Sequence, residues 1–223
     1  IKREKKKRRK SFSRNKEVLM VEGRKQIGIM GGTFDPVHNA HLVLAEQAYS
    51  QFSLDEVWMM PNGNPPHKRE YSQADVGHRM EMVRLAIQNV PYLRLCGLEQ
   101  SANSYHYTYE TMSVLNSTYP DHQFYFIMGA DSLFDFEDWK EPAIICRECV
   151  LLAATRDHCR KEKILRRIEE LKEKYNADIR ILNTPNMDVA SEAIRRKIQQ
   201  KEDIAGMVPE DVAKYIRQNH LYE

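Results

Sequence analysis

Two histidines with helical spacing are the residues in this sequence that are best suited to chemistry. His38 and His41 lie three positions apart in the segment IGIMGGTFDPVHNAH, residues 27–41. In the first turn of a helix, residues at this spacing share a face. Imidazoles at a helix N-terminus can donate hydrogen bonds to phosphate oxygens, and the helix dipole favours the same anion. The pair therefore indicates a phosphate site, with a capped helix bearing two solvated histidines as the alternative.

The segments around the histidines favour the phosphate interpretation. An apolar run at residues 27–30 predicts a buried parallel strand, and Gly31 and Gly32 allow a tight turn after it. A helix is predicted to begin at about Val37, with Leu44, Ala48 and Phe52 on its apolar stripe. Neither a GxGxxG fingerprint nor a P-loop is present. The order strand, glycine turn, helix therefore directs backbone N–H groups towards one spot.

The segment GGTFDPVHNAH, residues 31–41, resembles the signature of the HxGH nucleotidyltransferases. The resemblance implies that His38 and His41 stabilise the α-phosphate of ATP during nucleotidyl transfer. It also implies an ATP-binding role for the residues that precede them, Gly31, Gly32, Thr33 and Phe34. Ala40 stands where the commonest pattern has glycine, and its methyl group is a small intrusion in the first helical turn.

The order of the remaining elements predicts an α/β fold. Further apolar runs at residues 54–60, 92–99, 124–128, 150–155 and 178–182 predict strands that alternate with helices. Helices are expected from Asp75 to about Asn89, over residues 161–175, and from Pro209 onward. We therefore expect a Rossmann-like doubly wound parallel sheet in a single domain with C-terminal helices, and a site at the carboxyl ends of the strands.

The first 25 residues differ in charge from the rest of the chain. They hold 12 of the 34 Lys and Arg but 3 of the 32 Asp and Glu, so residues 26–223 carry a net negative charge. We predict a basic, disordered extension at residues 1–25 and a nucleotidyltransferase domain at residues 26–223. The extension is either a basic arm for RNA, acidic partners or a membrane surface, or an extension without a binding role.

A second motif lies near the end of the chain. Residues 189–195, VASEAIR, resemble the ISSTxIR motif of the same family, with matches at Ser191 and Arg195. The resemblance implies that a helix N-terminus, a hydroxyl and an arginine bind the ATP triphosphate. Ala190 and Glu192 depart from the motif, and a carboxylate at position 192 is unfavourable beside phosphates unless it points away. Taken alone, this pattern predicts only a helix start.

Three segments resemble the nicotinate-nucleotide branch of the family. The loop that ends at Lys68 resembles one that lies near the substrate phosphates, with ordinary loop polarity as the alternative. The segment YHYTYET resembles SYTxDT, in which a Tyr-Thr pair recognises the nicotinate carboxylate; Tyr107 and Thr108 match, whereas His106 and Glu110 do not.

The third of these segments follows the strand predicted at residues 124–128. Gly129 permits close approach of a ligand, and Asp131 is suited to ribose hydroxyls or to capping a helix. The GAD…W resemblance implies that Trp139 stacks on the nicotinate ring, and the alternative is a core or lid anchor. Arg156 follows the fifth predicted strand and is assigned to the adenine side of ATP.

The sequence is thus identified as a member of the nicotinate-nucleotide adenylyltransferases. The resemblance implies transfer of the adenylyl group from ATP, with Mg²⁺, to nicotinate mononucleotide by direct in-line attack. One alternative is a sister enzyme that acts on nicotinamide mononucleotide or phosphopantetheine. The other is a non-catalytic nucleotide- or RNA-binding protein that uses the basic extension. Homo-oligomerisation stays open.

The cysteines and the absence of long apolar runs suggest where the protein is located. Four cysteines without a disulfide-like pattern favour a reducing cytoplasm, and neither a secretory signal nor a transmembrane run is predicted. Cys146 and Cys149, with His158 and Cys159, nominally offer four zinc ligands. Because Cys149 is expected to enter a buried strand, we predict no metal site there.

Overall fold

The computed structural model describes residues 23–63, 74–100, 106–155 and 161–223. Within these residues, six parallel strands form one sheet in the order β3-β2-β1-β4-β5-β6. This is the doubly wound order of a Rossmann sheet, so the predicted fold class is confirmed. The strands are β1 (Lys25–Gly32), β2 (Glu56–Pro61), β3 (Leu93–Leu95), β4 (His122–Gly129), β5 (Val150–Thr155) and β6 (Ile179–Asn183).

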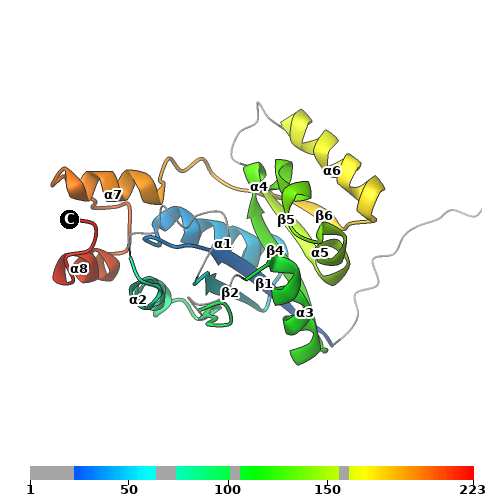
Figure 1. Cartoon of the computed structure of the whole chain (residues 1–223), viewed down its shortest axis with the longest axis horizontal. Helices are drawn as coiled ribbons and strands as arrows, with labels where there is room; N and C mark the ends of the chain where they lie inside the picture. Colours follow the sequence, from blue (N-terminus) through cyan, green and yellow to red (C-terminus); the bar gives the residue numbers. More distant parts are fainter. Residues whose placement is uncertain (1–22, 64–73, 101–105, 156–160) are drawn as a thin grey trace, which may run out of the picture.

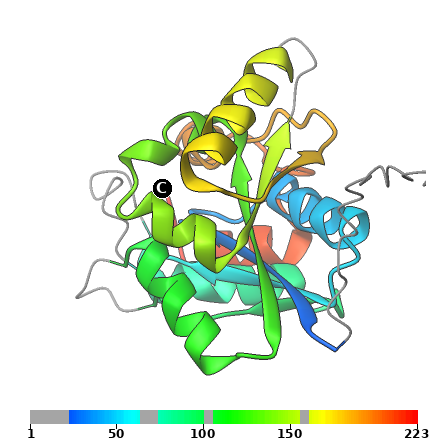
Figure 2. The ribbon, with the colours of Figure 1, turned by 90° about the vertical axis from the view of Figure 1, so that its right-hand side faces the viewer.

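Helices cover both faces of the sheet (Figure 2). One face packs against α1 (Asn39–Gln51), α2 (Val76–Ile87), α7 (Ser191–Gln199) and α8 (Glu210–Gln218). The other face packs against α3 (Thr108–Thr118), α4 (Ala130–Phe134), α5 (Pro142–Glu148) and α6 (Lys161–Tyr175), and a short 3-10 turn, η1 (Phe136–Asp138), follows α4. Figure 1 shows that α7, α8 and the C-terminus lie together at one end of the molecule.

Strand β4 shows why a continuous apolar run forms a central strand. Phe124, Phe126 and Met128 face the α3–α6 side, whereas Tyr125 and Ile127 face the α1 side. All five side chains are buried. Successive residues of a strand point to opposite faces, so a strand covered by helices on both faces needs apolar residues at every position.

Two sequence-based boundaries were inaccurate. The third strand was predicted over residues 92–99 but covers Leu93–Leu95, because the chain turns where Gln100 donates to the Gly97 carbonyl (3.2 Å). The first helix begins at Asn39 instead of Val37, since His38 has an extended backbone. Helix α3, for which no boundary was predicted from the sequence, begins at Thr108 and has Tyr107 as its N-cap.

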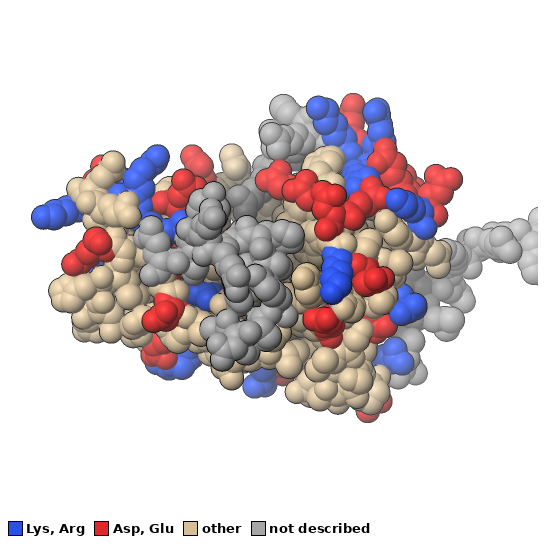
Figure 3. Space-filling view, in the orientation of Figure 1, with Lys and Arg blue, Asp and Glu red and all other residues tan. Residues whose placement is uncertain are grey.

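Helix α6 lies on an outer face of the molecule. Ile164, Ile168 and Leu171 are buried, whereas Leu165 is 41% exposed. Figure 3 shows acidic and basic side chains mixed over this helix. Arg167 of the helix pairs with Glu137 at 2.7 Å.

The predicted basic extension falls almost entirely at residues 1–22, outside the described part of the chain, and Lys25 already belongs to β1. In the described residues, no helix combines the length and the apolar character that crossing a membrane requires.

Candidate active site

The two histidines lie at the junction between β1 and α1. His38 is the N-cap residue, and its backbone N–H donates to Nδ1 of His41 at 3.2 Å. The two imidazole rings stack, with centroids 3.7 Å apart and planes 23° from parallel. The expectation that both rings share one face is therefore confirmed. Because Nδ1 of His41 accepts a hydrogen bond, the neutral ring carries its proton on Nε2 and can donate it to a ligand.

The Phe34 ring packs against the histidine pair at His41. This ring is buried and meets the His41 ring edge-on, with centroids 5.0 Å apart. The same ring lies against Gly32, where an added Cβ would come within 3.1 Å of Phe34 Cζ. Gly32 therefore allows the aromatic ring to approach the backbone. Gly31 is exposed beside it, so its backbone is open to a ligand.

The second motif lies beside the first, although the two are far apart in sequence. The Ser191 hydroxyl donates to the Pro36 carbonyl at 2.9 Å, and Arg195 Nη1 donates to the Asp35 carbonyl at 2.6 Å. The N-terminus of α7 therefore adjoins the histidine loop, residues 31–41. Glu192, in the first turn of α7, is exposed to solvent.

Arg79 joins three segments under the histidine loop. It is 1% exposed and donates to the carbonyl oxygens of Thr33 (2.7 Å), Asn62 (2.7 Å) and Ala74 (3.1 Å). Burial lowers the pKa of Arg79, and the nearby Asp35 carboxylate opposes that shift. Arginine nonetheless stays charged in proteins, so Arg79 is a buried cation in contact with the histidine loop.

Sequence reasoning missed Arg79, although the sequence contains a signal for it. Arg79 precedes Met82, Val83 and Ala86 by three, four and seven positions, so it lies on the buried stripe of α2. A charged side chain on such a stripe requires buried hydrogen-bond partners.

Tyr107 and Trp139, assigned to the nicotinate end, lie at the start of α3 and in the segment before α5, which Lys140 connects. Lys140, the neighbour of Trp139, places Nζ 4.3 Å from the centroid of the Tyr107 ring. The Trp139 ring packs edge-on against Phe126, with centroids 5.8 Å apart, and remains partly exposed. Thr108 opens α3 directly after Tyr107.

A buried carboxyl lies behind this corner. Glu99 is 7% exposed, and Thr111 Oγ1 donates to its Oε1 at 2.5 Å. Burial raises the pKa of Glu99, and the Thr111 hydrogen bond opposes the shift. The bond ties the segment after β3 to the first turn of α3, which carries Thr108.

The other assigned residues have different positions. Gly129 ends β4 and is the N-cap of α4, while Asp131 is exposed in the first turn of that helix. Asp131 is therefore not the cap that the alternative interpretation proposed. Lys68 and Arg156 fall outside the described residues.

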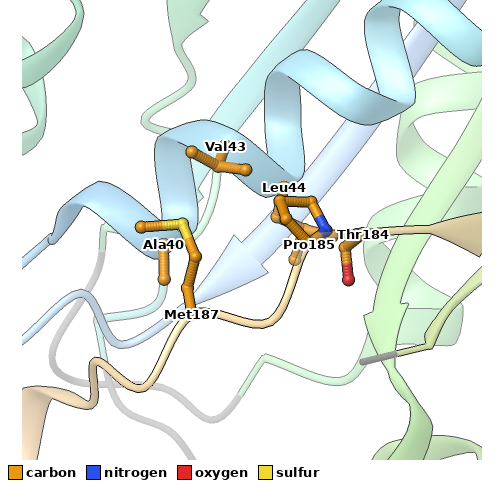
Figure 4. Close-up of a pocket in the computed structure, with 6 residues that line it drawn as sticks. All are labelled: Ala40, Val43, Leu44, Thr184, Pro185 and Met187. Carbon is orange, nitrogen blue, oxygen red and sulfur yellow. The ribbon is translucent and has the colours of Figure 1, made fainter. Parts of the chain in front are cut away.

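A pocket lies between α1 and the segment that follows β6 (Figure 4). Its walls are Ala40, Val43, Leu44, Thr184, Pro185 and Met187. The Ala40 methyl group, at the position where the family signature has glycine, borders this pocket directly next to His41 in sequence. Sequence reasoning did not assign Thr184, Pro185 or Met187 to a site, since these loop residues form no recognisable motif.

The cysteine pair lies on the far side of the sheet. Cys146 and Cys149 are buried free thiols. Burial raises the pKa of Cys146 to about 11 and raises that of Cys149 as well, which disfavours the thiolate that a metal binds. No group of three metal-binding side chains occurs among the described residues, which exclude His158 and Cys159.

The fold and the two adjoining helix N-termini define a nucleotide-binding α/β protein. A cytidylyltransferase-like family model matches residues 29–197. The chain belongs to this family, in the group of nicotinate-nucleotide adenylyltransferases, which confirms the resemblance predicted from the motifs.

Individual relatives agree with this assignment. A Lachnoclostridium phytofermentans protein named "Probable nicotinate-nucleotide adenylyltransferase" is 38% identical over 198 residues, covering 89% of this chain and 99% of that protein. A Clostridium acetobutylicum protein of the same name is 37% identical, with coverage of 89% and 99%. The solved structure of Plasmodium falciparum nicotinic acid mononucleotide adenylyltransferase complexed with NaAD has the same fold, with a TM-score of 0.74 at 23% identity, and covers 89% of this chain and 98% of that one.

Proposed function

We propose that this chain transfers the adenylyl group of ATP to nicotinate mononucleotide, giving deamido-NAD and pyrophosphate. The names of its relatives support this reaction. The observation that carries it is the meeting of the histidine loop with α7, through the Ser191 and Arg195 hydrogen bonds. Two helix N-termini and an arginine thereby surround one space, which suits a triphosphate.

The reaction is a direct displacement at phosphorus. The 5′-phosphate of the mononucleotide attacks the α-phosphorus of ATP, the new P–O bond forms, and the bond to pyrophosphate breaks. Such a transfer depends on positioning and on stabilising developing charge, and it needs no covalent nucleophile. In this scheme Nε2 of His41 and the His38 ring hold the α- and β-phosphates, and Arg195 neutralises the leaving pyrophosphate.

The wall of the pocket beside α1 is our proposed contact surface for adenine, since the pocket itself has room for about one water molecule. Its lining of aliphatic and thioether side chains suits one face of a flat ring. Ala40 links it directly to the histidine pair, so a nucleotide seated there would direct its phosphates towards His41. Thr184 supplies a polar atom at the rim.

Magnesium is proposed to enter with ATP. Mg²⁺ is commonly held by substrate phosphates, waters and one or two carboxylates, and it supplies charge neutralisation for the leaving group. The described residues hold no cluster of three metal-binding side chains, so we assign the metal to the nucleotide phosphates. Residues of this chain then orient the nucleotide around it.

The acceptor is proposed to bind along the Tyr107 and Trp139 corner. The indole face of Trp139 stacks on the pyridine ring, and the α3 N-terminus at Thr108 faces its carboxylate. Gly129 and Asp131 are placed near the acceptor from the end of β4. Lys68 and Arg156 keep their predicted roles towards phosphate and adenine.

Pyrophosphate release with ATP and Mg²⁺ tests the proposal. Nicotinate mononucleotide should be preferred strongly over nicotinamide mononucleotide, and phosphopantetheine should be inactive. Release with the amide alone would keep the reaction class and overturn the acid specificity. No release with any acceptor, together with salt-sensitive RNA binding that depends on residues 1–22, would favour the non-catalytic alternative. The oligomeric state and the cytoplasmic location stay predictions.

A further inference from the structure

The carboxylate of Asp35, three residues before His38, is the point where the end of the chain meets the histidine loop. Asp35 is 3% exposed, and its Oδ1 accepts a hydrogen bond from the Tyr222 hydroxyl at 2.7 Å. Its other oxygen, Oδ2, lies 3.8 Å from Arg195 Nη1. That nitrogen instead donates to the Asp35 carbonyl oxygen at 2.6 Å. The Asp35 carboxylate therefore lies closer to the neutral Tyr222 hydroxyl than to the positively charged Arg195 guanidinium.

The backbone of the C-terminal segment directs the Tyr222 hydroxyl towards Asp35. After α8 the chain reverses through two residues with left-handed backbones, His220 (φ 51°) and Tyr222 (φ 68°). The Leu221 N–H donates back to the Ile216 carbonyl at 3.1 Å. Tyr222 is 6% exposed. Burial and the Asp35 carboxylate both raise the pKa of Tyr222, so its hydroxyl remains a donor at neutral pH.

Of the two arginines beside Asp35, Arg79 is already committed elsewhere. Its guanidinium donates to carbonyl oxygens of Thr33, Asn62 and Ala74. Among the described residues, Arg195 is therefore the cation that the carboxylate could capture. An arginine fork and a carboxylate readily form a bidentate pair, and that pair would occupy the donors that phosphate oxygens need.

We propose that Tyr222 is a positioning residue for the triphosphate subsite: its hydroxyl holds the Asp35 carboxylate and keeps it from closing on Arg195. This inference rests on the proposed function, in which Arg195 binds phosphate. Without the hydroxyl, Oδ2 has only about 1 Å to move before it reaches the 2.7–2.9 Å separation of a charge-assisted hydrogen bond. Tyr222 thus acts on ATP and pyrophosphate through Arg195, without touching either.

Steady-state kinetics of Tyr222→Phe in the full chain test this role. The ring stays and the hydroxyl is lost, so the KM for ATP should rise about three- to tenfold, the range that one hydrogen bond supports. The KM for pyrophosphate in the reverse direction should rise similarly. The KM for nicotinate mononucleotide should stay within about twofold, because Arg195 is assigned to the leaving pyrophosphate and not to the acceptor.

A double-mutant cycle separates positioning from general packing. Asp35→Asn removes the charge that would capture Arg195, so adding Tyr222→Phe to it should change the KM for ATP by less than about twofold. Tyr215→Phe is the matched control, because Tyr215 lies in α8 and its hydroxyl is 2.9 Å from Nδ1 of His78 in α2. This control should keep the wild-type KM for ATP.

Two results would overturn the inference. One is an unchanged KM for ATP and pyrophosphate in Tyr222→Phe. The other is a parallel rise of KM for all substrates with a fall in thermal midpoint, which a structural role predicts. If the wild-type chain shows no turnover, the proposed function fails separately; the Kd of ATP for wild type and Tyr222→Phe, measured by calorimetry, then still decides whether Tyr222 controls ATP binding.

Discussion

The hydroxyl of Ser191 donates a hydrogen bond to the carbonyl oxygen of Pro36 at 2.9 Å, across 155 positions of sequence. Pro36 belongs to the histidine loop, and Ser191 opens α7. The bond therefore holds two helix N-termini side by side at the end of β1. Phosphate binding by either terminus would be weak alone, and in the proposed function their convergence forms the triphosphate site.

His41→Ala removes the donor that the proposed function directs at the reacting phosphate. We expect kcat to fall about a hundredfold or more, since one well-placed donor contributes roughly 2.7–4 kcal/mol to transition-state stabilisation. The thermal midpoint should change little, because His41 is partly exposed. Pyrophosphate release measures the effect, and Glu46→Ala, exposed on the same helix, is the control. Near-normal turnover of His41→Ala would exclude the assigned role.

Trp139→Ala should chiefly weaken binding of the mononucleotide. Loss of aromatic stacking on a base costs roughly 1–3 kcal/mol, so the KM for the acceptor should rise about 5- to 100-fold, while the KM for ATP stays near wild type. Initial rates at varied acceptor concentration measure this. Phe134→Ala, at a partly exposed aromatic residue in α4, serves as the control. An unchanged acceptor KM would remove Trp139 from the site.

Arg79→Met should destabilise the fold and the histidine loop together. The substitution leaves buried carbonyl oxygens without their donor and removes one of the two described arginines beside Asp35, a loss of roughly 3–5 kcal/mol. The free energy of unfolding in urea measures the loss. Arg84→Met is the matched control, because Arg84 lies on the same helix and pairs with Glu81 at the surface. Equal stability of the two variants would contradict the structural role of Arg79.

Gly28→Ala should overpack the core. A Cβ at Gly28 would lie 2.9 Å from Leu54 Cδ1 and 3.1 Å from Val57 Cγ2, so we expect a loss of about 1–3 kcal/mol. Gly77→Ala is the opposite case, because nothing lies within 4 Å of an added Cβ there. That variant should be neutral or stabilised by up to about 1 kcal/mol. Urea unfolding compares the two, and a stable Gly28→Ala would disprove the tight packing.

Glu99→Gln should change how stability depends on pH. A carboxyl with a raised pKa binds its proton more tightly when folded, so its stabilising effect is present below the ordinary value of 4.5 and is lost as pH rises through the folded-state pKa. Relative to wild type, Glu99→Gln should therefore gain stability as pH rises from 4.5. Urea unfolding across pH measures this, with exposed Glu162→Gln as the control. A pH-independent difference would show that Glu99 has an ordinary pKa.

Local pattern alone determined much of this protein. Apolar runs and glycine turns predicted a parallel sheet whose strands alternate with helices. Buried strands and tight turns each depend on residues that are close together in sequence, so a local pattern is enough to predict them. The spacing of His38 and His41 predicted rings on one face, which the stacked imidazoles confirm. Boundaries were less accurate at the edge strand β3, where hydrogen bonding to a single neighbour and a turn decide the end.

Only the tertiary structure brought distant residues to one point. Arg79, Asp35 and Tyr222 belong to three separate segments, and no local pattern relates their hydrogen-bonding groups. A buried charge is tolerated only where the folded chain supplies partners from elsewhere, and those partners here include backbone carbonyls that carry no residue-specific signal. The sequence by itself therefore specified the sheet and the chemical groups, and long-range packing decided which of them meet.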